Sequence, residues 1–404
     1  MKLRLFRIAT LFSWLNKRQQ NTLLHIIGSL SRTVLAVTFL FSGFVKAVDP
    51  LGTVYKVQDY LAAFTEHFGS FFEHLVPFAG TLAVTLIVIE FVLGWLLLFN
   101  VRTSVTSWVT LAFMLVMTPI TWWLATTNAV SDCGCFGDAI KLTNWQTFYK
   151  NVILLGLVLI LLFTKKTIPQ LFSWWAELGL LLIGLGGVAG VMGYSYTHLP
   201  IIDFRPYKVG ANLVELTQAP ETDTTVVMHV MEKDGVRKQV ANEDYMAAIE
   251  EGWTWKEQTS TPCKKVGNKL EPIESQDPPI TDFIISEFFG EDDGIGVEVT
   301  KEILELDTVT LICMHDVVKA NKKQADRAVA LYKQLHNQYE KCYILTSSST
   351  EEVRNFAKAN ELEDEAFLYL DRKPLETVIR ANPGVVVLEK GVIKSKTNMR
   401  QVKL

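Results

Sequence analysis

Cysteine is scarce in this chain, and the few cysteines have no repeated spacing. Among 404 residues there are 5, of which Cys133 and Cys135 sit together while the other three are scattered. An odd number without a repeated spacing excludes a disulfide scaffold. An excess of positive charge is also lacking, because the formal net charge is −4. The composition therefore gives no reason to expect a nucleic-acid partner.

The first half of the chain, up to about Tyr196, instead has long apolar runs. A membrane span needs ~20 mostly apolar residues, because the hydrocarbon core is ~30 Å thick and a helix rises ~1.5 Å per residue. The sequence predicts about five such helices: Leu23–Val48, Phe78–Phe99, Ser104–Thr126, Gln146–Phe163 and Glu177–Tyr196. No small-residue cleavage site follows the first, so it is predicted to remain uncleaved. The lipid bilayer is the first partner this implies.

Basic residues predict the orientation of these helices. They precede the first helix or lie between the second and third and between the fourth and fifth: Lys2, Arg4, Arg7, Lys17, Arg18, Arg102, Lys165 and Lys166. The positive-inside rule then places the N-terminus in the cytoplasm. Residues 49–77, the loop 127–145 and everything after Tyr196 face outward. We therefore predict a multi-pass protein of the cell inner (cytoplasmic) membrane with an extracytoplasmic C-terminal domain.

Among the charged residues inside the predicted spans, three are candidate functional residues: Arg32, Lys46 and Glu90. A lone carboxylate at such depth costs at least ~2.5 kcal/mol unless it is paired, protonated or hydrated. Counting the helical rise from the outer ends of the two helices predicts Arg32 as the partner of Glu90. Either the two form an ion pair that fixes the register of the helices, or Glu90 is a carboxylate that handles protons or contacts a ligand. Lys46 lies near the outer end of its helix, where it snorkels to the headgroups or points at the outward cysteines.

Two further patterns concern helix packing. Gly186 and Gly190 form a small-xxx-small pair, which predicts close helix approach inside the bundle, or dimerisation as the alternative. Between the first two spans, apolar residues at helical spacing from Leu51 to Phe64 predict an amphipathic helix on the outer face. It is either a simple interfacial helix or a lid over the cysteine loop.

The outward loop reads Asp132-Cys133-Gly134-Cys135-Phe136-Gly137-Asp138. Two thiols one residue apart, flanked by glycines, suggest a strained and therefore labile disulfide. Three interpretations compete: a redox-active dithiol, a structural turn, and metal or cluster ligation. The last is weak, because two ligands do not complete a site, and no metal site is predicted. The neighbouring acids would tend to raise a thiol pKa, which argues against a strongly activated thiolate.

These motifs together resemble a known family. The Ser42-Gly-Phe-Val-Lys46 segment, Asp49-Pro50, Glu90 followed by Gly94, and the Cys133–Gly137 element resemble the DoxX superfamily, particularly its MauE-like branch, over residues 23–165. The resemblance implies a small helical membrane bundle, usually of about four helices. It also implies a link to redox processes and, for MauE, to maturation of the disulfide-rich methylamine dehydrogenase. This chain departs from that pattern by adding a fifth helix and a long tail, which puts a methylamine-specific role in doubt.

The tail reads as a soluble α/β region. Residues 199–279 are predicted as a linker and small β-containing region, and residues 280–404 alternate strands and helices, which predicts a parallel sheet. A proline, Pro383, precedes the last hairpin, as it does in thioredoxin-like domains, and a cis bond is expected there. The predicted organisation is a cytoplasmic N-terminus (1–22), a DoxX/MauE-like bundle (23–165), a fifth helix (166–198), the linker region, and a thioredoxin-like domain.

The expected Cys-x-x-Cys pair of that domain is absent. After the strand Thr308–Met314 the chain has His315 and Asp316, so thiol chemistry is not available there. These two residues and Pro383 form a weak candidate site, with a helix-start Asp and a satisfied His as the alternative. Cys313 and Cys342 are predicted to be buried thiols too far apart for a disulfide. Nothing in the sequence supports a role for Cys263.

Two functional hypotheses remain nearly level. In the first, Cys133 and Cys135 exchange electrons with a quinone-like carrier or a partner thiol, and the tail recruits an extracytoplasmic protein. In the second, the protein is a non-enzymatic scaffold or assembly factor whose tail binds a partner. A transporter using Glu90 and Arg32 is disfavoured, since no inverted repeat is visible.

Overall fold

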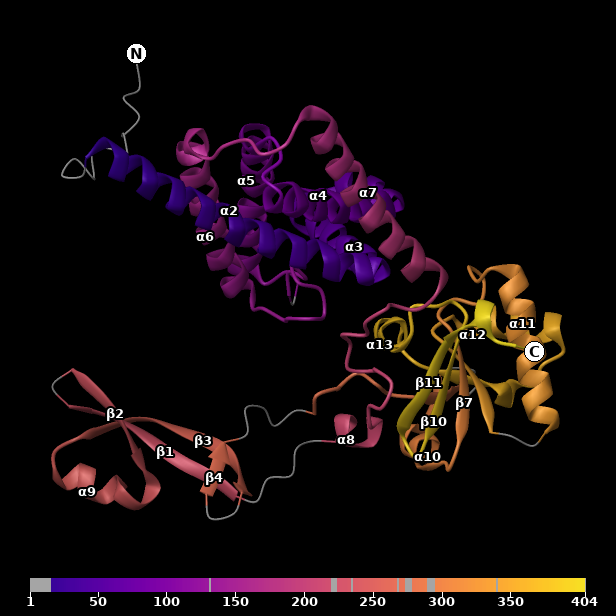
Figure 1. The fold of residues 1–404 in the computed structure, drawn as a ribbon. Coiled ribbons are helices and arrows are strands. Elements are labelled where there is room, and N and C mark those ends of the chain that lie inside the picture. Colours follow the sequence, from indigo (N-terminus) through magenta and orange to yellow (C-terminus); the bar gives the residue numbers. More distant parts are fainter. Residues whose placement is uncertain are drawn as a thin grey trace. The chain divides into compact units, whose positions relative to one another are not determined.

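The architecture is that of a computed structural model, which describes residues 16–130, 132–218, 224–233, 235–266, 269–272, 278–288, 295–338 and 341–403. The chain divides into two compact units, whose elements are labelled in Figure 1. The first unit contains Met1–Arg205 together with Thr377–Ala381 and Thr397–Lys403. The second contains Pro206–Glu376, Asn382–Lys396 and Leu404.

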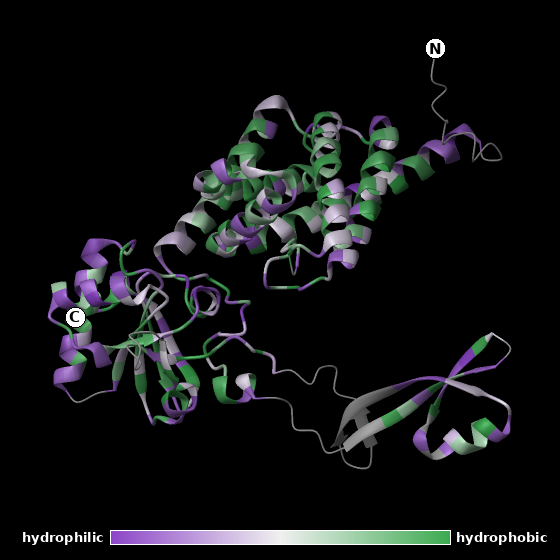
Figure 2. Ribbon diagram, turned by 180° about the vertical axis from the view of Figure 1, so that it is seen from behind, coloured by the Kyte–Doolittle hydropathy of each residue, from purple (hydrophilic) through white to green (hydrophobic). Residues whose placement is uncertain are grey.

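Five helices of the first unit have the length and apolar composition to cross a membrane. They are α2 (Lys17–Val48), α4 (Ala79–Leu98, preceded by the 3-10 segment η1, Ser70–Phe78), α5 (Thr103–Thr127), α6 (Asn144–Thr164, followed by η2, Lys165–Thr167) and α7 (Trp174–Thr197). Hydrophobic residues predominate along them in Figure 2. Large apolar side chains such as Trp108 and Ile183 are more than half exposed, at 57% and 61%, as expected where lipid surrounds a bundle. The prediction of five spans is confirmed.

Short polar sequences set where these helices begin. Asn16 starts α2 and Thr143 starts α6, each in a capping box with a glutamine three residues later. Asp49 accepts a hydrogen bond from the backbone N–H of Gly52 at 3.1 Å and starts α3, Pro50–Phe68. Proline suits the first helical position because its missing N–H would be unpaired there. Helix α3 confirms the amphipathic helix predicted between the first two spans.

Helices α2 and α4 touch backbone to backbone at two glycines. A methyl group added at Gly43 would clash with the backbone of Phe91, and one at Gly94 would clash with the backbone of Leu40. These two contacts fix the antiparallel register of the helices. In that register Glu90 is level with Phe44 of α2.

Gly186 and Gly190 of α7 do not make the close helix contact that the sequence predicts. Among the residues that the structure describes, a Cβ at Gly186 or Gly190 would meet no atom within 4 Å, whereas one at Gly184 would meet Trp95. The prediction that the first two allow close packing inside the bundle is therefore wrong. Helix α7 instead contributes Val188 and Met192 to a small apolar cluster with α2 and α4. The dimerisation alternative stays a prediction.

The second unit begins with a four-stranded antiparallel sheet in the order β2-β1-β3-β4. Its elements, with the short helix that precedes them, are α8 (Leu213–Thr217), β1 (Thr224–Lys233), β2 (Val236–Ala241), η3 (Asn242–Asp244), α9 (Tyr245–Glu250), β3 (Thr254–Val266) and β4 (Lys269–Pro272). Gly235 has a φ of +79° at the turn between β1 and β2, a conformation open to glycine. These strands lie in the stretch predicted to contain a small β region. Asp234, which the sequence suggests as a turn residue, and the side chain of Cys263 lie outside the described part.

A seven-stranded sheet of order β11-β10-β7-β8-β9-β5-β6 follows, and apart from the last two residues of β11 it belongs to the second unit. Its strands are β5 (Ser286–Phe288), β6 (Ile295–Glu298), β7 (Val309–Met314), β8 (Cys342–Thr346), β9 (Phe367–Tyr369), β10 (Gly384–Glu389) and β11 (Val392–Asn398). Strands β7, β8 and β9 are parallel, whereas β10 runs antiparallel to β7 and β5 antiparallel to β9. The prediction of a parallel sheet is therefore right only for the three central strands, because the strand next to them on each side, β10 or β5, is antiparallel to them.

Helices alternate with these strands, as predicted for an α/β domain. They are α10 (Thr300–Glu305), α11 (Lys322–Asn337), α12 (Thr350–Asn360), the 3-10 segment η4 (Asp364–Ala366), α13 (Arg372–Val378) and η5 (Met399–Gln401). Helix α12 begins with Ser349 in a capping box with Glu352. The sequence predicts the helix here over Lys322–Tyr339, and its last residue lies outside the described residues.

The two thiols of this sheet lie where the sequence predicts them. Cys313 of β7 pairs with Leu345 of β8, and Cys342 pairs with Thr310, so the thiols are three rungs apart on parallel strands. Both are buried. At about 3.3 Å per residue this separation is too long for a disulfide between them.

Candidate functional site

The cysteine loop lies between α5 and α6 and is held by two local turns. The Asp132 carboxylate accepts a hydrogen bond from the backbone N–H of Gly134 at 2.9 Å. The N–H of Gly137 then donates to the carbonyl of Gly134 at 3.0 Å, which closes a turn around Cys135. Both glycines have positive φ, +63° and +51°, in the left-handed region that other residues rarely adopt. Glycine at these places is what lets the chain fold back within so few residues.

This turn brings the two sulfur atoms together. The Sγ atoms of Cys133 and Cys135 are 3.1 Å apart, and both residues are reduced and partly exposed. An S–S bond is about 2.05 Å long, so closure needs an approach of only about 1 Å. The pair is therefore close enough to cycle between dithiol and disulfide without rearrangement of the bundle.

Helix α3 covers one side of the loop. The Tyr60 hydroxyl donates to the carbonyl oxygen of Cys133 at 3.0 Å, and the Lys56 ammonium pairs with Asp132 at 2.8 Å. Lys56 and Tyr60 are four residues apart and so share one face of the helix. A lid over the cysteine loop, one of the two alternatives that the sequence left open for this helix, requires contacts of this kind.

Three polar side chains lie on the membrane side of Cys135. The Ser42 hydroxyl oxygen is 2.6 Å from the carbonyl oxygen of Cys135 and 2.7 Å from Oε2 of Glu90. The Lys46 ammonium donates to both carboxylate oxygens of Glu90, at 2.8 and 2.7 Å, and to the Ser42 hydroxyl at 3.3 Å. All three are buried. This Ser42–Lys46–Glu90 cluster joins the intramembrane charges to the cysteine loop.

The predicted pairing of Arg32 with Glu90 is wrong. Arg32 donates instead to the carbonyl oxygens of Leu97 and Leu98, the latter at 2.8 Å, at the end of α4. The last carbonyls of a helix have no partner within it, so an arginine satisfies them well. The α2–α4 register places Lys46, and not Arg32, beside Glu90. Because Lys46 is buried and paired with Glu90, it does not snorkel to the headgroups; that it acts on the cysteines stays a prediction.

The two thiols differ in acidity. A hydrogen bond from the Cys133 thiol lowers the pKa of Cys135 to about 6, against the effect of burial and with help from the charges of Lys150 and Lys46. The same hydrogen bond, together with burial, raises the pKa of Cys133 well above its ordinary value. The prediction that nearby acids prevent an activated thiolate is thus wrong for Cys135. The physical reason is that the hydrogen bond from Cys133, together with the charges of Lys150 and Lys46, outweighs burial and the negative charge of Glu90.

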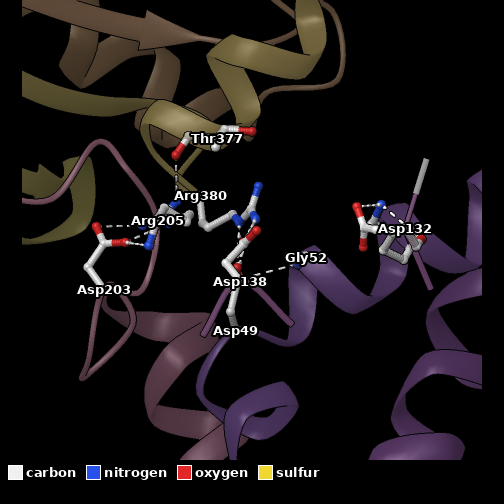
Figure 3. Close-up of polar contacts among 9 residues, drawn as sticks. Asp49, Gly52, Asp132, Asp138, Asp203, Arg205, Thr377 and Arg380 are labelled. Atoms are coloured by element: carbon white, nitrogen blue, oxygen red, sulfur yellow. Dashed lines mark hydrogen bonds and ion pairs between the residues drawn. The ribbon is translucent and has the colours of Figure 1, made fainter. Parts of the chain in front are cut away.

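A second polar cluster surrounds Asp49, just after α2 (Figure 3). Arg380 donates to both oxygens of Asp49 at 3.0 and 2.9 Å and lies 3.7 Å from Asp138 of the cysteine loop. Burial would raise the pKa of Asp49, but the charge and hydrogen bonds of Arg380 hold it below its usual value. Arg205 forms a similar two-pronged pair with Asp203. Nothing in the sequence order relates Arg380 to Asp49, so sequence reasoning missed this contact.

The weak candidate site in the tail has mainly local partners. Asp316 accepts hydrogen bonds from the backbone N–H groups of Val318 and Lys319 at 3.0 and 2.9 Å, which is what a turn-forming aspartate does. His315 is buried, and its carbonyl accepts from a serine hydroxyl. The Asn382-Pro383 bond is cis, as expected, and Asn382 donates to the carbonyl of Asp316 at 3.2 Å. The three predicted residues are thus brought into one neighbourhood.

No metal-binding cluster stands out beside these sites. Within the described residues, no three His, Cys, Asp or Glu side chains gather as ligands of one ion would. The chemistry open to the cysteine loop is that of two adjacent thiols next to a buried carboxylate and an ammonium group.

The fold and the cysteine loop define a multi-pass membrane protein with a thiol pair at one end of its helices. Comparison with protein families matches residues 24–164 to the family described as Methylamine utilisation protein MauE. The matched segment contains α2 from Leu24 onward, all of α3 to α6, the Ser42–Lys46–Glu90 cluster and the cysteine loop. It confirms the MauE part of the resemblance. Helix α7 and the second unit lie beyond it. No curated protein matches the chain.

Proposed function

We propose that this protein is a membrane thiol–disulfide oxidoreductase in which Cys133 and Cys135 are the redox-active pair. The 3.1 Å separation of their sulfur atoms carries the proposal. An acidic Cys135 adds to it, because the thiolate is the form that attacks a disulfide or reduces an acceptor. Oxidation of the pair delivers two electrons to a quinone-class carrier in the bilayer or to the disulfide of a partner protein.

The N-terminus is cytoplasmic in this proposal, and the loop and the second unit are extracytoplasmic, in the inner membrane. That side permits thiol oxidation, whereas the cytosol opposes it. The distribution of Arg and Lys supports the orientation. A thiol reagent that cannot cross the membrane should reach Cys135 in intact cells.

The α/β domain is thioredoxin-like in this proposal and recruits an extracytoplasmic client. The order β11-β10-β7-β8, with β7 and β8 parallel, α11 between them and a hairpin at the end, supports the assignment. So does the position of Pro383 directly before β10. His315 and Asp316 replace the thiol pair, so the domain binds and does not transfer electrons. A DoxX relationship of the bundle belongs to the same proposal.

Trapping of the thiols tests the function. Membranes or the purified full-length protein are equilibrated with redox buffers, quenched with acid and labelled with a maleimide. The expected result is a reversible transition in which Cys133 and Cys135 lose two labels together. Cys313 is a matched internal control, because it is buried and should stay unlabelled in the folded protein at every potential.

The competing function is a scaffold without redox chemistry, favoured by the lack of a cysteine pair after β7. Replacing both loop cysteines with serine separates the two. Loss of quinone-analogue reduction and of client oxidation supports the oxidoreductase. Unchanged client oxidation, or loop thiols that never oxidise, supports the scaffold.

A further inference from the structure

Arg380 contacts two parts of the cysteine site at once, although 331 residues separate it from Asp49 (Figure 3). Its Nη2 lies 2.8 Å from one carboxylate oxygen of Asp49 and 3.7 Å from one of Asp138. The short segment that carries it, Thr377–Ala381, belongs to the same compact unit as the membrane-spanning helices. Arg380 is therefore part of that unit, even though it lies beyond the segment matched to MauE.

Asp49 connects Arg380 to helix α3. The carboxylate that binds the guanidinium also accepts from the backbone N–H of Gly52 at 3.1 Å, so the same side chain caps the helix. Farther along, α3 holds the start of the cysteine loop through Lys56 and Tyr60. An arginine that fixes the start of α3 thereby fixes the direction from which these two side chains reach the loop.

Asp138 connects Arg380 to the other end of the cysteine loop, three residues after Cys135. The Arg380 side chain is only 7% exposed, so solvent screens its charge weakly. Without this cation, the two carboxylates that share its Nη2 would repel each other, because like charges at this range disfavour one another. Their repulsion would move the start of α3 away from the end of the loop.

A second arginine fixes the segment that carries Arg380. Arg205 donates to the carbonyl oxygen of Thr377 at 3.0 Å and is itself held by both oxygens of Asp203. The ring of Tyr55 on α3 adds a face for the Arg380 guanidinium, whose carbon lies 5.4 Å from the ring centre. The guanidinium is thus held in a defined place, as a group that positions its neighbours must be.

We propose that Arg380 is a positioning residue for the Cys133–Cys135 pair. By holding the start of α3 to the end of the cysteine loop, it keeps the two sulfur atoms within reach of each other. This inference rests on the proposed function.

The step that needs this geometry is closure of the disulfide. With oxidised glutathione as acceptor, the Cys135 thiolate attacks one sulfur, the glutathione S–S bond breaks and one glutathione thiolate leaves. The Cys133 thiol then loses its proton to water, and its sulfur attacks Cys135 and releases the second glutathione thiolate. Two electrons pass in all from the two cysteine sulfurs to the two glutathione sulfurs. The second attack is intramolecular, so its rate depends on how the two sulfur atoms are placed.

The first test follows this closure in the purified full-length protein in detergent. Oxidised glutathione is added, samples are quenched with acid, and the mixed disulfide is measured by intact mass. The wild type should close without accumulating it. Arg380→Gln should close about tenfold to a hundredfold more slowly and accumulate the mixed disulfide, since misplacing reacting atoms by about 1 Å costs on the order of a hundredfold.

The second test is the pH profile of Cys135 alkylation by iodoacetamide. The hydrogen bond from the Cys133 thiol is the largest cause of the low pKa of Cys135, and that bond needs the loop geometry. In Arg380→Gln the midpoint should therefore rise from near 6 by about one pH unit or more. A loss of global stability alone would leave the midpoint of the folded molecules unchanged.

Two further variants sharpen both tests. Arg380→Lys keeps the positive charge, so the carboxylates stay compensated, but an ammonium group lacks the rigid fork of the guanidinium. It should fold and fall between the wild type and Arg380→Gln in both measurements. The matched control, Arg400→Gln, alters an exposed arginine of η5 in the other tail segment of the same unit and should behave as the wild type.

The outcomes separate the inference from the function on which it rests. Folded Arg380→Gln that matches the wild type in both measurements overturns the inference and leaves the oxidoreductase standing. Where Arg380→Gln does not fold, Arg380→Lys decides, because slower closure supports the inference and unchanged closure overturns it. A wild-type protein that never closes its disulfide with oxidised glutathione overturns both.

Discussion

The Lys46–Glu90 pair makes a strong prediction about stability. Replacing Lys46 with Met removes the only ammonium group that donates to Glu90 in the described structure, where two contacts of 2.7 and 2.8 Å join them. Both side chains are nearly enclosed, at 6% and 9% exposure. Removing one member of a buried ion pair costs about 3–5 kcal/mol, because the other charge is left without compensation.

The measurement is thermal unfolding of the purified protein in detergent, followed by tryptophan fluorescence. For a unit of 150–250 residues, 1 kcal/mol lowers Tm by about 2–4 °C, so Lys46→Met should lower Tm by about 6–20 °C. Lys46→Met with Glu90→Met replaces the pair by apolar groups and should recover most of the loss. Lys166→Met, at an exposed lysine of η2, should change the free energy of unfolding by less than about 0.5 kcal/mol. A stable Lys46→Met protein, or a double variant no better than the single one, would refute the reasoning.

Two other predictions concern the loop and the helix packing. The rate of Cys135 alkylation by iodoacetamide should rise with pH to a plateau, with a midpoint near 6, because the thiolate is the reactive form and its pKa is about 6. Lys150→Met should move that midpoint upward, whereas Lys141→Met, at an exposed loop lysine, should not. A midpoint near 9 in the wild type would contradict the lowered pKa of Cys135. Gly94→Val should separate α2 from α4 and lower Tm. Gly190→Val, whose side chain meets open space, should leave Tm within a few degrees. An equal loss of Tm in the two variants would argue against the packing described.

Sequence patterns predicted the helices well because they depend on local information. The five spans, helix α3 and the alternation of strands and helices around β7 follow from apolar runs and periodicity, which need no knowledge of distant contacts. The cysteine loop was predictable for the same reason, since its glycines and thiols are neighbours in the chain.

Pairing between helices was not predictable in this way. Counting residues from the helix ends put Arg32 opposite Glu90, but the register depends on where Gly43 and Gly94 let the backbones meet. The signal was present in part, because Ser42 and Lys46 are four residues apart and must share a helix face. Arg380 carried no such signal, since 331 residues separate it from Asp49.

The register of α2 against α4 has a consequence for biogenesis. Each helix, inserted alone, would expose a charge to lipid at a cost of about 2.5–3.5 kcal/mol, but α3 joins them into a hairpin in which the charges neutralise each other. We expect the translocon to release the two helices together, which staged glycosylation reporters placed after α2 and after α4 would reveal.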